Sequence, residues 1–296
     1  MGSGSWTLKN YATYCCSLGR GYDESTKTYA ASYDSASQAY VTHMLDESMD
    51  PKNVIRECCD SDEHPGTIPI ILALDVTGSM GSTALEVSKK LNPIMIDIYK
   101  RVKDAEIMVM AIGDLAYDTA PIQMSQFESD IRIAENLDKV YFESGGGGND
   151  YESYTAAWYM GLKHCKLDCW KRGKKGLIIT MGDEPLNPYL PHRQLNRVTG
   201  DTSQDDVETA KLFKEASEKF DIYHISVESR SYPDQTQERK SFAKVIGEQN
   251  AIVSSVDDIS DKIIAIVEDF AGKSKQSIIV ESTKPASTDE NGEISW

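Results

Sequence analysis

Three side chains of one short segment, Asp75, Thr77 and Ser79, carry oxygen atoms at alternate positions. The apolar run before them, residues 68–74, is typical of a buried strand, and a long apolar-periodic segment follows at residues 82–101. An acid at the carboxyl end of a parallel strand lies where open α/β sheets bind their ligands. Hydroxyls in the next turn can reach the same point. One carboxylate with two hydroxyls is a hard, all-oxygen donor set, which favours Mg²⁺ over zinc or copper.

The elements that must position these side chains alternate between strand and helix patterns from residue 67 onward. This alternation predicts a Rossmann-like α/β fold, a doubly wound, mostly parallel six-stranded sheet with helices on both faces. The predicted strands lie near residues 68–75, 106–112, 139–143, 176–182, 221–228 and 251–255. The predicted helices lie near residues 82–101, 130–137, 151–168, 205–219, 235–247 and 257–271.

Changes of composition divide the chain into three parts. Residues 1–66 are rich in Tyr and Ser and predict an N-terminal helical arm, with helices near residues 35–47 and after Pro51. Residues 67–272 form the predicted α/β domain. The polar residues 273–296 predict a mobile C-terminal tail.

The pattern Asp-Val-Thr-Gly-Ser at residues 75–79 resembles the metal-ion-dependent adhesion site (MIDAS) of the von Willebrand factor A (VWA) family, usually Asp-x-Ser-x-Ser. That family completes its site with a hydroxyl residue from a Gly-rich loop and with an acid after the next strand. The counterparts in this chain are the glycines at residues 145–148, followed by Asn149, and Asp183. The resemblance covers residues 67–272 and implies a VWA fold.

The resemblance also implies ligand roles for Mg²⁺ or Mn²⁺. Asp75 would anchor the ion, directly or through a bound water, and the hydroxyls of Thr77 and Ser79 would bind it directly. Asp183 would hold a metal-bound water and orient the other ligands. The alternatives are local: Asp75 can cap the following helix, and both hydroxyls can bond to the backbone of the turn.

The fourth ligand departs from the family pattern, which has Thr in the Gly-rich loop. The first polar residues after the glycines are Asn149 and Asp150. The amide oxygen of Asn149 can still bind a hard cation. Asp150 either ligates the ion or caps the helix that follows.

The function implied by the resemblance is binding rather than catalysis. Such a site leaves one coordination position open, and a Glu or Asp carboxylate of a partner protein fills it. The expected partner is an AAA+ ATPase or a multi-protein complex, because intracellular members of the family work with these. The chain is therefore expected not to be an enzyme.

The alternative is a phosphoryl-transfer enzyme of the haloacid-dehalogenase (HAD) type, with Asp75 as its nucleophile. Asp-Val-Thr-Gly-Ser is similar to the Asp-Lys-Thr-Gly-Thr motif of the ATPases in that class. The second Gly-rich motif of that class needs an acid for Mg²⁺, and this chain has Gly in its place. The small hydrolases of the class also need an acid two residues after the nucleophile, where this chain has Thr77.

Net charge and hydropathy limit the partners further. The formal net charge is −16, which argues against binding to nucleic acid or to an anionic membrane surface. No run of 18 apolar residues and no signal-peptide pattern is present, so we expect a cytoplasmic location. The six cysteines are then reduced; the pairs at residues 15–16 and 58–59 lack the usual C-x₂-C spacing of a zinc site.

The long interval at residues 184–204 is either a specificity loop or a surface insertion.

Overall fold

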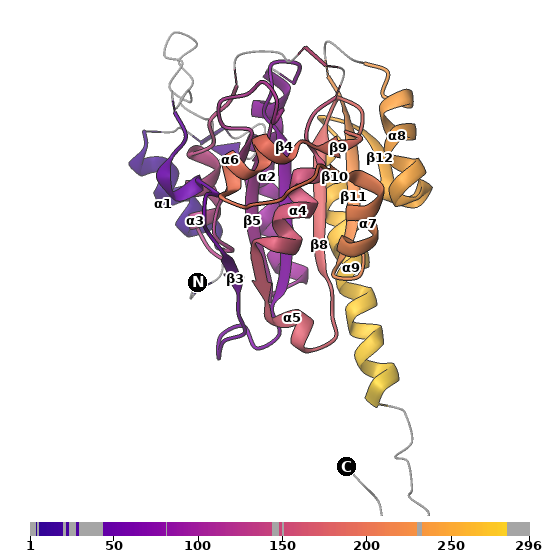
Figure 1. The fold of residues 1–296 in the computed structure, drawn as a ribbon. Helices are drawn as coiled ribbons and strands as arrows, with labels where there is room; N and C mark the ends of the chain where they lie inside the picture. Colours follow the sequence, from indigo (N-terminus) through magenta and orange to yellow (C-terminus); the bar gives the residue numbers. More distant parts are fainter. Residues whose placement is uncertain are drawn as a thin grey trace, which may run out of the picture.

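A six-stranded sheet in the order β12-β11-β8-β4-β5-β6 forms the centre of the molecule (Figure 1). The computed structural model describes residues 4, 6–19, 22–23, 28–29, 44–80, 82–143, 148–149, 151–229 and 233–282. The strands of the sheet are β4 (Ile68–Asp75), β5 (Ala105–Ile112), β6 (Ile122–Met124), β8 (Gly176–Gly182), β11 (Phe220–Glu228) and β12 (Ala251–Ser255). All neighbours pair in parallel except β6, which is antiparallel to β5.

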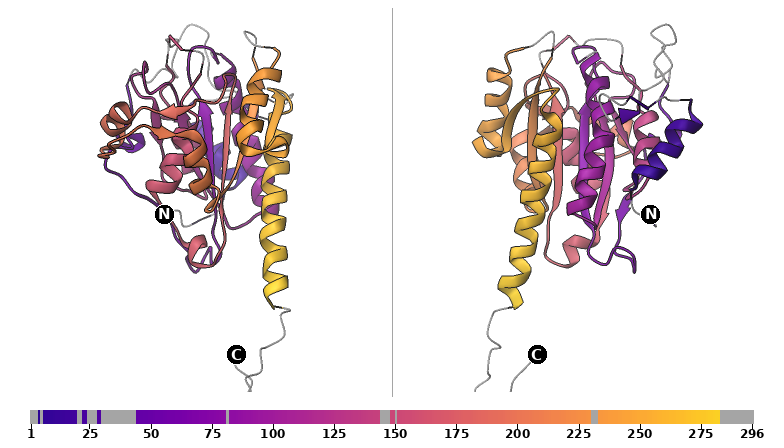
Figure 2. Two further views of the ribbon diagram at one scale, coloured as in Figure 1. Left: turned by 45° about the vertical axis from the view of Figure 1, so that its right-hand side comes forward. Right: turned by 180° about the vertical axis from the view of Figure 1, so that it is seen from behind.

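Helices cover both faces of this sheet, which confirms the predicted doubly wound α/β class (Figure 2). One face is covered by α1 (Leu8–Ser17), α2 (Ser82–Arg101), α3 (Arg132–Asp138) and α9 (Ile259–Ser282). The other face is covered by α4 (Thr155–Lys163), α5 (Asp168–Lys171), α6 (His192–Thr199), α7 (Thr209–Ala216) and α8 (Thr236–Ile246). The smaller elements are β1 (Tyr22–Asp23), β2 (Thr28–Tyr29), β3 (Arg56–Cys58), β7 (Cys165–Leu167), β9 (Tyr189–Leu190), β10 (Val207–Glu208) and two 3₁₀ helices (Glu47–Met49 and Glu248–Asn250).

The central strand β4 explains why the apolar run before Asp75 is continuous rather than alternating. Successive side chains of a strand point to opposite faces, and both faces of this sheet are covered. Ile70, Leu72 and Leu74 pack in the core with α2 and α9, whereas Ile71 and Ala73 pack in the core with α4 and α8. A strand buried on both sides needs an apolar residue at every position.

The strand order reverses at β4. The chain passes from β4 through α2 to β5 on one side, and later crosses back through α4 to β8 on the other side. In open α/β sheets such a switch point leaves a crevice at the carboxyl ends of the two strands, where ligands bind. The fold therefore places the ends of β4 and β8 at its expected ligand-binding edge.

The predicted strand at residues 139–143 is wrong, and β6 takes its place as the sixth strand. The side-chain amide of Gln123 bonds both backbone groups of Tyr141, accepting from its N–H at 2.9 Å and donating to its carbonyl at 2.7 Å. The N–H of Glu143 donates to the carbonyl of Val76. These bonds give backbone groups of residues 141 and 143 their hydrogen-bond partners without pairing to a neighbouring strand. The strand-like composition of this segment is therefore misleading.

The helices predicted in the N-terminal arm, and the end of the helix predicted at residues 151–168, differ from the structure. Most of residues 35–47 lies outside the described residues, and the described residues 52–66 form no helix. Instead β3 pairs in parallel with β7, which joins the end of the predicted arm to the body. The same pairing ends the predicted helix of residues 151–168, because α4 stops at Lys163 and the chain then extends into β7.

The two ends of the described chain are both helical. In the N-terminal arm, α1 packs in the same core as α2, α3 and α9. The Tyr14 hydroxyl donates to Asp138, the last residue of α3, at 2.5 Å. At the other end α9 continues to Ser282, past the residue at which the predicted tail begins, and extends beyond the sheet (Figure 1). No helix among the described residues is long and apolar enough to span a membrane.

Candidate metal centre

The predicted site lies at the carboxyl ends of β4 and β8. Asp75 is the last residue of β4, and Asp183 directly follows β8, its parallel neighbour. Thr77 and Ser79 lie in the turn that leads from β4 into α2. Asp75 is 0% exposed and Asp183 is 1% exposed, so both carboxylates are removed from bulk water.

Short contacts join these four residues as two hydrogen-bonded pairs, Asp75 with Thr77 and Ser79 with Asp183, whose hydroxyls lie next to each other. Asp75 Oδ1 accepts from the backbone N–H of Thr77 at 2.9 Å and from its hydroxyl at 2.7 Å. The hydroxyl of Ser79 donates to Asp183 Oδ1 at 2.9 Å. The two hydroxyl oxygens are 3.1 Å apart. The structure thus brings together four of the five residues that the sequence singles out.

The protons of these two hydroxyls determine what the cluster can bind. A hydroxyl carries one proton and two lone pairs. With the proton of Thr77 on Asp75 and that of Ser79 on Asp183, no proton remains for the 3.1 Å contact between the two oxygens. Both oxygens then present lone pairs to the same place, an arrangement suited to a cation.

Asp75 is held on both of its oxygens. Its Oδ2 accepts a hydrogen bond from the Tyr154 hydroxyl at 2.5 Å, while Thr77 binds Oδ1. Burial raises the pKa of Asp75 to about 7, and the hydrogen bonds from Thr77 and Tyr154 oppose that shift. Nothing in the residue types around Tyr154 signals this role, because the contact depends on how α4 packs against β4.

Glu152 is a second residue that sequence reasoning missed. It is 6% exposed, and its Oε2 is enclosed without a hydrogen-bond partner among the described residues. Burial, and then the negative charge of Asp75, raise the pKa of Glu152 to about 10; Asp118 and Asp114 add to the effect. The available signal was its position, an acid between the Gly-rich loop and the next helix.

Asp183 has the same character. Burial raises its pKa, and hydrogen bonds from Ser229 and Ser79 oppose that shift. Its Oδ2 is enclosed and accepts no hydrogen bond from the described residues. The strongest influences on the pKa values of Asp75, Glu152 and Asp183 are burial, hydrogen bonds and other acids, with no Lys or Arg among them. Burial therefore favours the protonated forms of these acids, and a cation could take the place of the protons.

Asn149 is not joined to the other four residues by any contact the structure describes. Its side chain bonds Asp114, a residue after β5, and lowers the pKa that burial raises there. Its Oδ1 is enclosed and has no partner among the described residues. The other candidate for this ligand, Asp150, and the glycines at residues 145–147 lie outside the described residues.

Acidic and thiol side chains alone do not build a metal site here. Within the described parts of the chain, no group of three or more His, Cys, Asp or Glu side chains is arranged to hold a metal ion. A cation at the carboxyl end therefore depends on the hydroxyls of Thr77 and Ser79. The same finding gives no support to a zinc site; Cys15 lies in α1 and Cys58 in β3.

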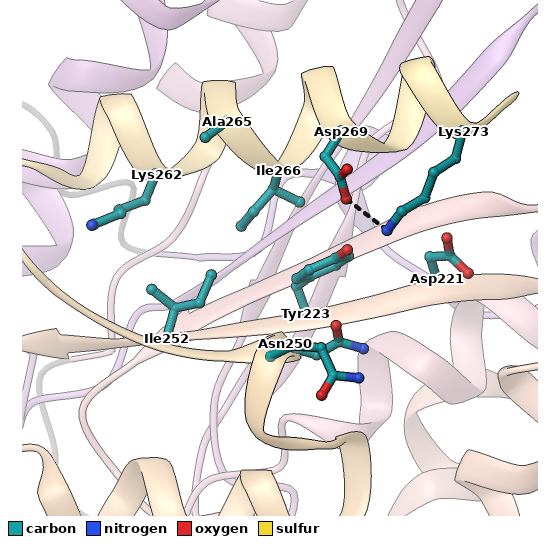
Figure 3. Close-up of a pocket in the computed structure, with 10 residues that line it drawn as sticks. Asp221, Tyr223, Asn250, Ile252, Lys262, Ala265, Ile266, Asp269 and Lys273 are labelled. Carbon is teal, nitrogen blue, oxygen red and sulfur yellow. Dashed lines mark ion pairs between the residues drawn. The ribbon is translucent and has the colours of Figure 1, made fainter. Parts of the chain in front are cut away.

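A separate cavity of about 510 Å³ lies between α9 and the strands β11 and β12 (Figure 3). Tyr223 and Ile266 face each other across it, and Lys273 forms an ion pair with Asp269 at 2.6 Å. Its lining includes Asp221, the second residue of β11, so it opens toward the amino end of that strand. The acid–hydroxyl cluster is at the other end of the sheet.

Comparisons with known proteins find similar solved structures only. No family model matches the chain, and no curated protein matches it. Similar structures include the open conformation of the pilus adhesin SpaC from Lactobacillus rhamnosus GG, with 12% identity, 74% of this chain and 31% of that chain covered, and a TM-score of 0.48. This chain thus spans about a third of the length of SpaC.

Two further similar structures are known. The vWF domain of the type V pili tip protein Mfa5 from Porphyromonas gingivalis has 11% identity, 75% and 98% coverage of the two chains, and a TM-score of 0.46. Proximal thread matrix protein 1 from the mussel byssus has 12% identity, 72% and 49% coverage, and a TM-score of 0.45. Likenesses of this size do not establish a relationship. The protein's class therefore follows from its own structure: a doubly wound α/β domain with an acid–hydroxyl cluster at its switch point.

Proposed function

We propose that this chain is a protein-binding module of the VWA type that holds Mg²⁺ or Mn²⁺ at the carboxyl ends of β4 and β8. The cation would coordinate the carboxylate of a Glu or Asp on a partner protein. The observation that carries this proposal is the pair of hydroxyl oxygens, Thr77 and Ser79, whose protons are committed to two different carboxylates. Their lone pairs converge where a hard cation is expected.

The residues present fit such an ion. All donors are oxygen atoms, which is the ligand chemistry of Mg²⁺ and Mn²⁺. Asp183 Oδ2 and Glu152 Oε2 are enclosed without a hydrogen-bond partner among the described residues, and a cation would replace the proton that burial favours on Glu152. Thr77, Ser79 and Asp183 would hold the ion, and Asp75 would orient Thr77. Asn149 remains a proposed ligand on the strength of its unpartnered Oδ1.

The chemistry supplied by the bound ion would be that of a Lewis acid with an open position. An external carboxylate is a suitable ligand for that position, because the hydroxyls contribute no charge of their own. We propose an AAA+ ATPase or a multi-protein complex as this partner. Nucleic acid and membrane surfaces are poor candidates for a chain with a net charge of −16.

The phosphoryl-transfer alternative has less support. A nucleophilic Asp75 would need an oxygen that the phosphorus atom can reach. Both of its oxygens accept hydrogen bonds, from Thr77 and from Tyr154, and the residue is 0% exposed. A binding role does not require Asp75 to be accessible.

The proposal is tested by titrating Mg²⁺ and Mn²⁺ calorimetrically into the metal-free wild type and the Asp75→Ala variant. We expect one ion to bind the wild type and none to bind the variant. A labelled peptide with a single Glu should then bind the Mg²⁺-loaded wild type, and the same peptide with Gln should not. Equal binding of both peptides, or binding unaffected by chelator, would contradict the proposed role.

A phosphorylated Asp75 after incubation with a phosphoryl donor would instead favour the enzyme. The readout is a mass increase of one phosphoryl group that is absent in Asp75→Ala.

A further inference from the structure

Tyr154 connects the two strand ends that form the proposed site. Its hydroxyl donates to Asp75 Oδ2 at 2.5 Å and accepts from the backbone N–H of Glu184 at 3.2 Å. Asp75 ends β4, and Glu184 follows directly after Asp183 at the end of β8. The hydroxyl oxygen of Tyr154, the residue before α4, therefore lies between the Asp75 carboxylate at the end of β4 and the backbone that follows β8.

The ring of Tyr154 is enclosed by other side chains. The side chain is 0% exposed. His224 contacts the ring edge-on with centroids 5.1 Å apart, and Phe242 does so at 5.4 Å. The hydroxyl of this buried ring bonds to residues at both strand ends and so links them directly.

Gly182 makes room for this hydroxyl. A Cβ atom at Gly182 would lie 2.1 Å from the Tyr154 hydroxyl oxygen, closer than any real contact. The last residue of β8 must therefore lack a side chain for the hydroxyl to reach Asp75. Two residues that are far apart in sequence, Tyr154 and Gly182, fit one another at the point where the proposed site is assembled.

The bond also fixes the orientation of Asp75. With Oδ1 bound by Thr77 and Oδ2 by Tyr154, the carboxylate has one rotational position in which both donors are satisfied. That position directs the Thr77 hydroxyl, whose proton goes to Asp75 and whose lone pairs face Ser79. Loss of the Tyr154 donor would free the carboxylate to rotate and to release the hydroxyl.

We propose that Tyr154 is a positioning residue of this site: its hydroxyl sets the orientation of Asp75 and the separation of Asp75 from the Asp183–Glu184 backbone, without touching the cation. The inference rests on the proposed Mg²⁺-binding function and adds to it a residue of α4's N-terminal flank. Binding of the cation is then coupled to the start of the segment after β8, because both depend on the same hydroxyl.

The test compares wild type, Tyr154→Phe and Tyr159→Phe. Phe keeps the ring packing and deletes only the hydroxyl. Tyr159 is a matched control on α4, 5% exposed, with its hydroxyl bonded to Asp201 at 2.7 Å rather than to the cluster. Calorimetry gives the Mg²⁺ affinity, and amide hydrogen exchange gives the protection of the Glu184 N–H with and without Mg²⁺.

We expect Tyr154→Phe to bind Mg²⁺ at least about tenfold more weakly, the effect of losing a hydrogen bond to a charged group. We also expect the Glu184 amide of Tyr154→Phe to exchange faster than that of the wild type. In Tyr159→Phe, the protection that Mg²⁺ gives this amide should equal that in the wild type. Gly182→Ala, which displaces the hydroxyl without deleting it, should weaken Mg²⁺ binding in the same direction. Near-ultraviolet circular dichroism checks that each variant is folded.

The outcomes separate this inference from the proposed function. Equal Mg²⁺ affinity of wild type and Tyr154→Phe would overturn the positioning role and leave the metal site intact. Equal weakening by Tyr159→Phe would also overturn it, since the effect would then be a general one of α4. A wild type that binds no Mg²⁺ but shows a slow Glu184 amide, lost in Tyr154→Phe, would overturn the metal site itself and reduce Tyr154 to a structural bond.

Discussion

Carboxylates at the two ends of the sheet have different partners: two acids at the amino end pair with arginines, and two at the carboxyl end are bonded by hydroxyls. At the amino end, Glu128 lies beside the start of β5 and forms an ion pair with Arg132 at 3.0 Å. The positive charge of Arg132 lowers the pKa of Glu128, against the effect of burial. At the carboxyl end, the groups that shift the pKa values of Asp75 and Glu152 include no Lys or Arg.

A second pair at the amino end has the same construction. Asp60 forms an ion pair with Arg172 and accepts a hydrogen bond from the Thr67 hydroxyl at 2.8 Å. Thr67 directly precedes β4, the strand whose other end carries Asp75. β4 thus begins next to an acid that is paired with an arginine, and it ends in Asp75, whose partners are a hydroxyl, a backbone N–H and a phenol.

The difference separates acids that the protein itself pairs with a cation from acids for which we propose an external one. A buried charge without a counter-ion is unfavourable, and it persists where it has another purpose. At the amino end, Glu128 and Asp60 pair with arginines, whereas Glu106 Oε2 has no hydrogen-bond partner among the described residues. At the carboxyl end, Asp75 and Asp183 are bonded by hydroxyls and one phenol, none of which supplies a positive charge.

The largest expected effect comes from Gly182→Ala. A methyl group 2.1 Å from the Tyr154 hydroxyl oxygen must displace a fully buried ring, so we expect a loss of about 3 kcal/mol in unfolding free energy. Urea denaturation measures this loss. Gly66→Ala is the control, because a Cβ there meets nothing within 4 Å. Equal stability of the two variants would show that the carboxyl end tolerates rearrangement.

The second prediction concerns the ion itself. Mg²⁺ at a hundred times its dissociation constant should raise the unfolding free energy of the wild type by about 2.7 kcal/mol. The increase should disappear in Ser79→Ala, which removes one of the two facing hydroxyls, and persist in Ser217→Ala, whose hydroxyl bonds the Lys214 carbonyl elsewhere. An increase of the same size in Ser79→Ala would place the ion somewhere else.

The third prediction is a pH dependence. The pKa of Glu152 is raised to about 10 in the folded protein, from 4.5, so the folded state holds a proton that the unfolded state releases. This contribution to stability is complete below the unfolded pKa and is lost as pH rises through the folded one. The melting temperature of metal-free protein should therefore fall from about pH 5 to about pH 9.

Glu152→Gln should flatten that profile, because the amide does not titrate. Saturating Mg²⁺ should flatten it for the wild type, since the cation replaces the proton as the counter-charge. Identical slopes in wild type and Glu152→Gln would mean that Glu152 is not the titrating group.

The smallest effect is expected at the amino end. Arg132→Met leaves Glu128 without its ion-pair partner, but Arg132 is 36% exposed and solvent screens the pair. We expect a loss of about 1 kcal/mol in unfolding free energy and no change in Mg²⁺ affinity. A changed affinity would show that the two ends of the sheet are not independent.

Much of the fold could be predicted from the sequence, because the central strands are apolar throughout and the helices are periodic. The alternation placed Asp75 and Asp183 at strand ends, and the strand order then makes them neighbours. The segment at residues 139–143 misled because a glutamine side chain, Gln123, satisfies its backbone. Local composition does not reveal such a partner.

The site was predictable to the extent that it is local. Thr77 and Ser79 lie within four residues of Asp75, so their spacing carries the information. Tyr154 was not predictable, because its role depends on the packing of α4's flank against β4 and on the missing side chain at Gly182.

The most direct test of the central claim is to count bound Mn²⁺ by electron paramagnetic resonance in wild type and in a Thr77→Val, Ser79→Ala double variant. The account predicts one ion per wild-type chain, displaced by Mg²⁺, and none in the double variant. A wild type that leaves all Mn²⁺ free, or a double variant that binds it equally well, would contradict the claim that these hydroxyls and acids form a metal site.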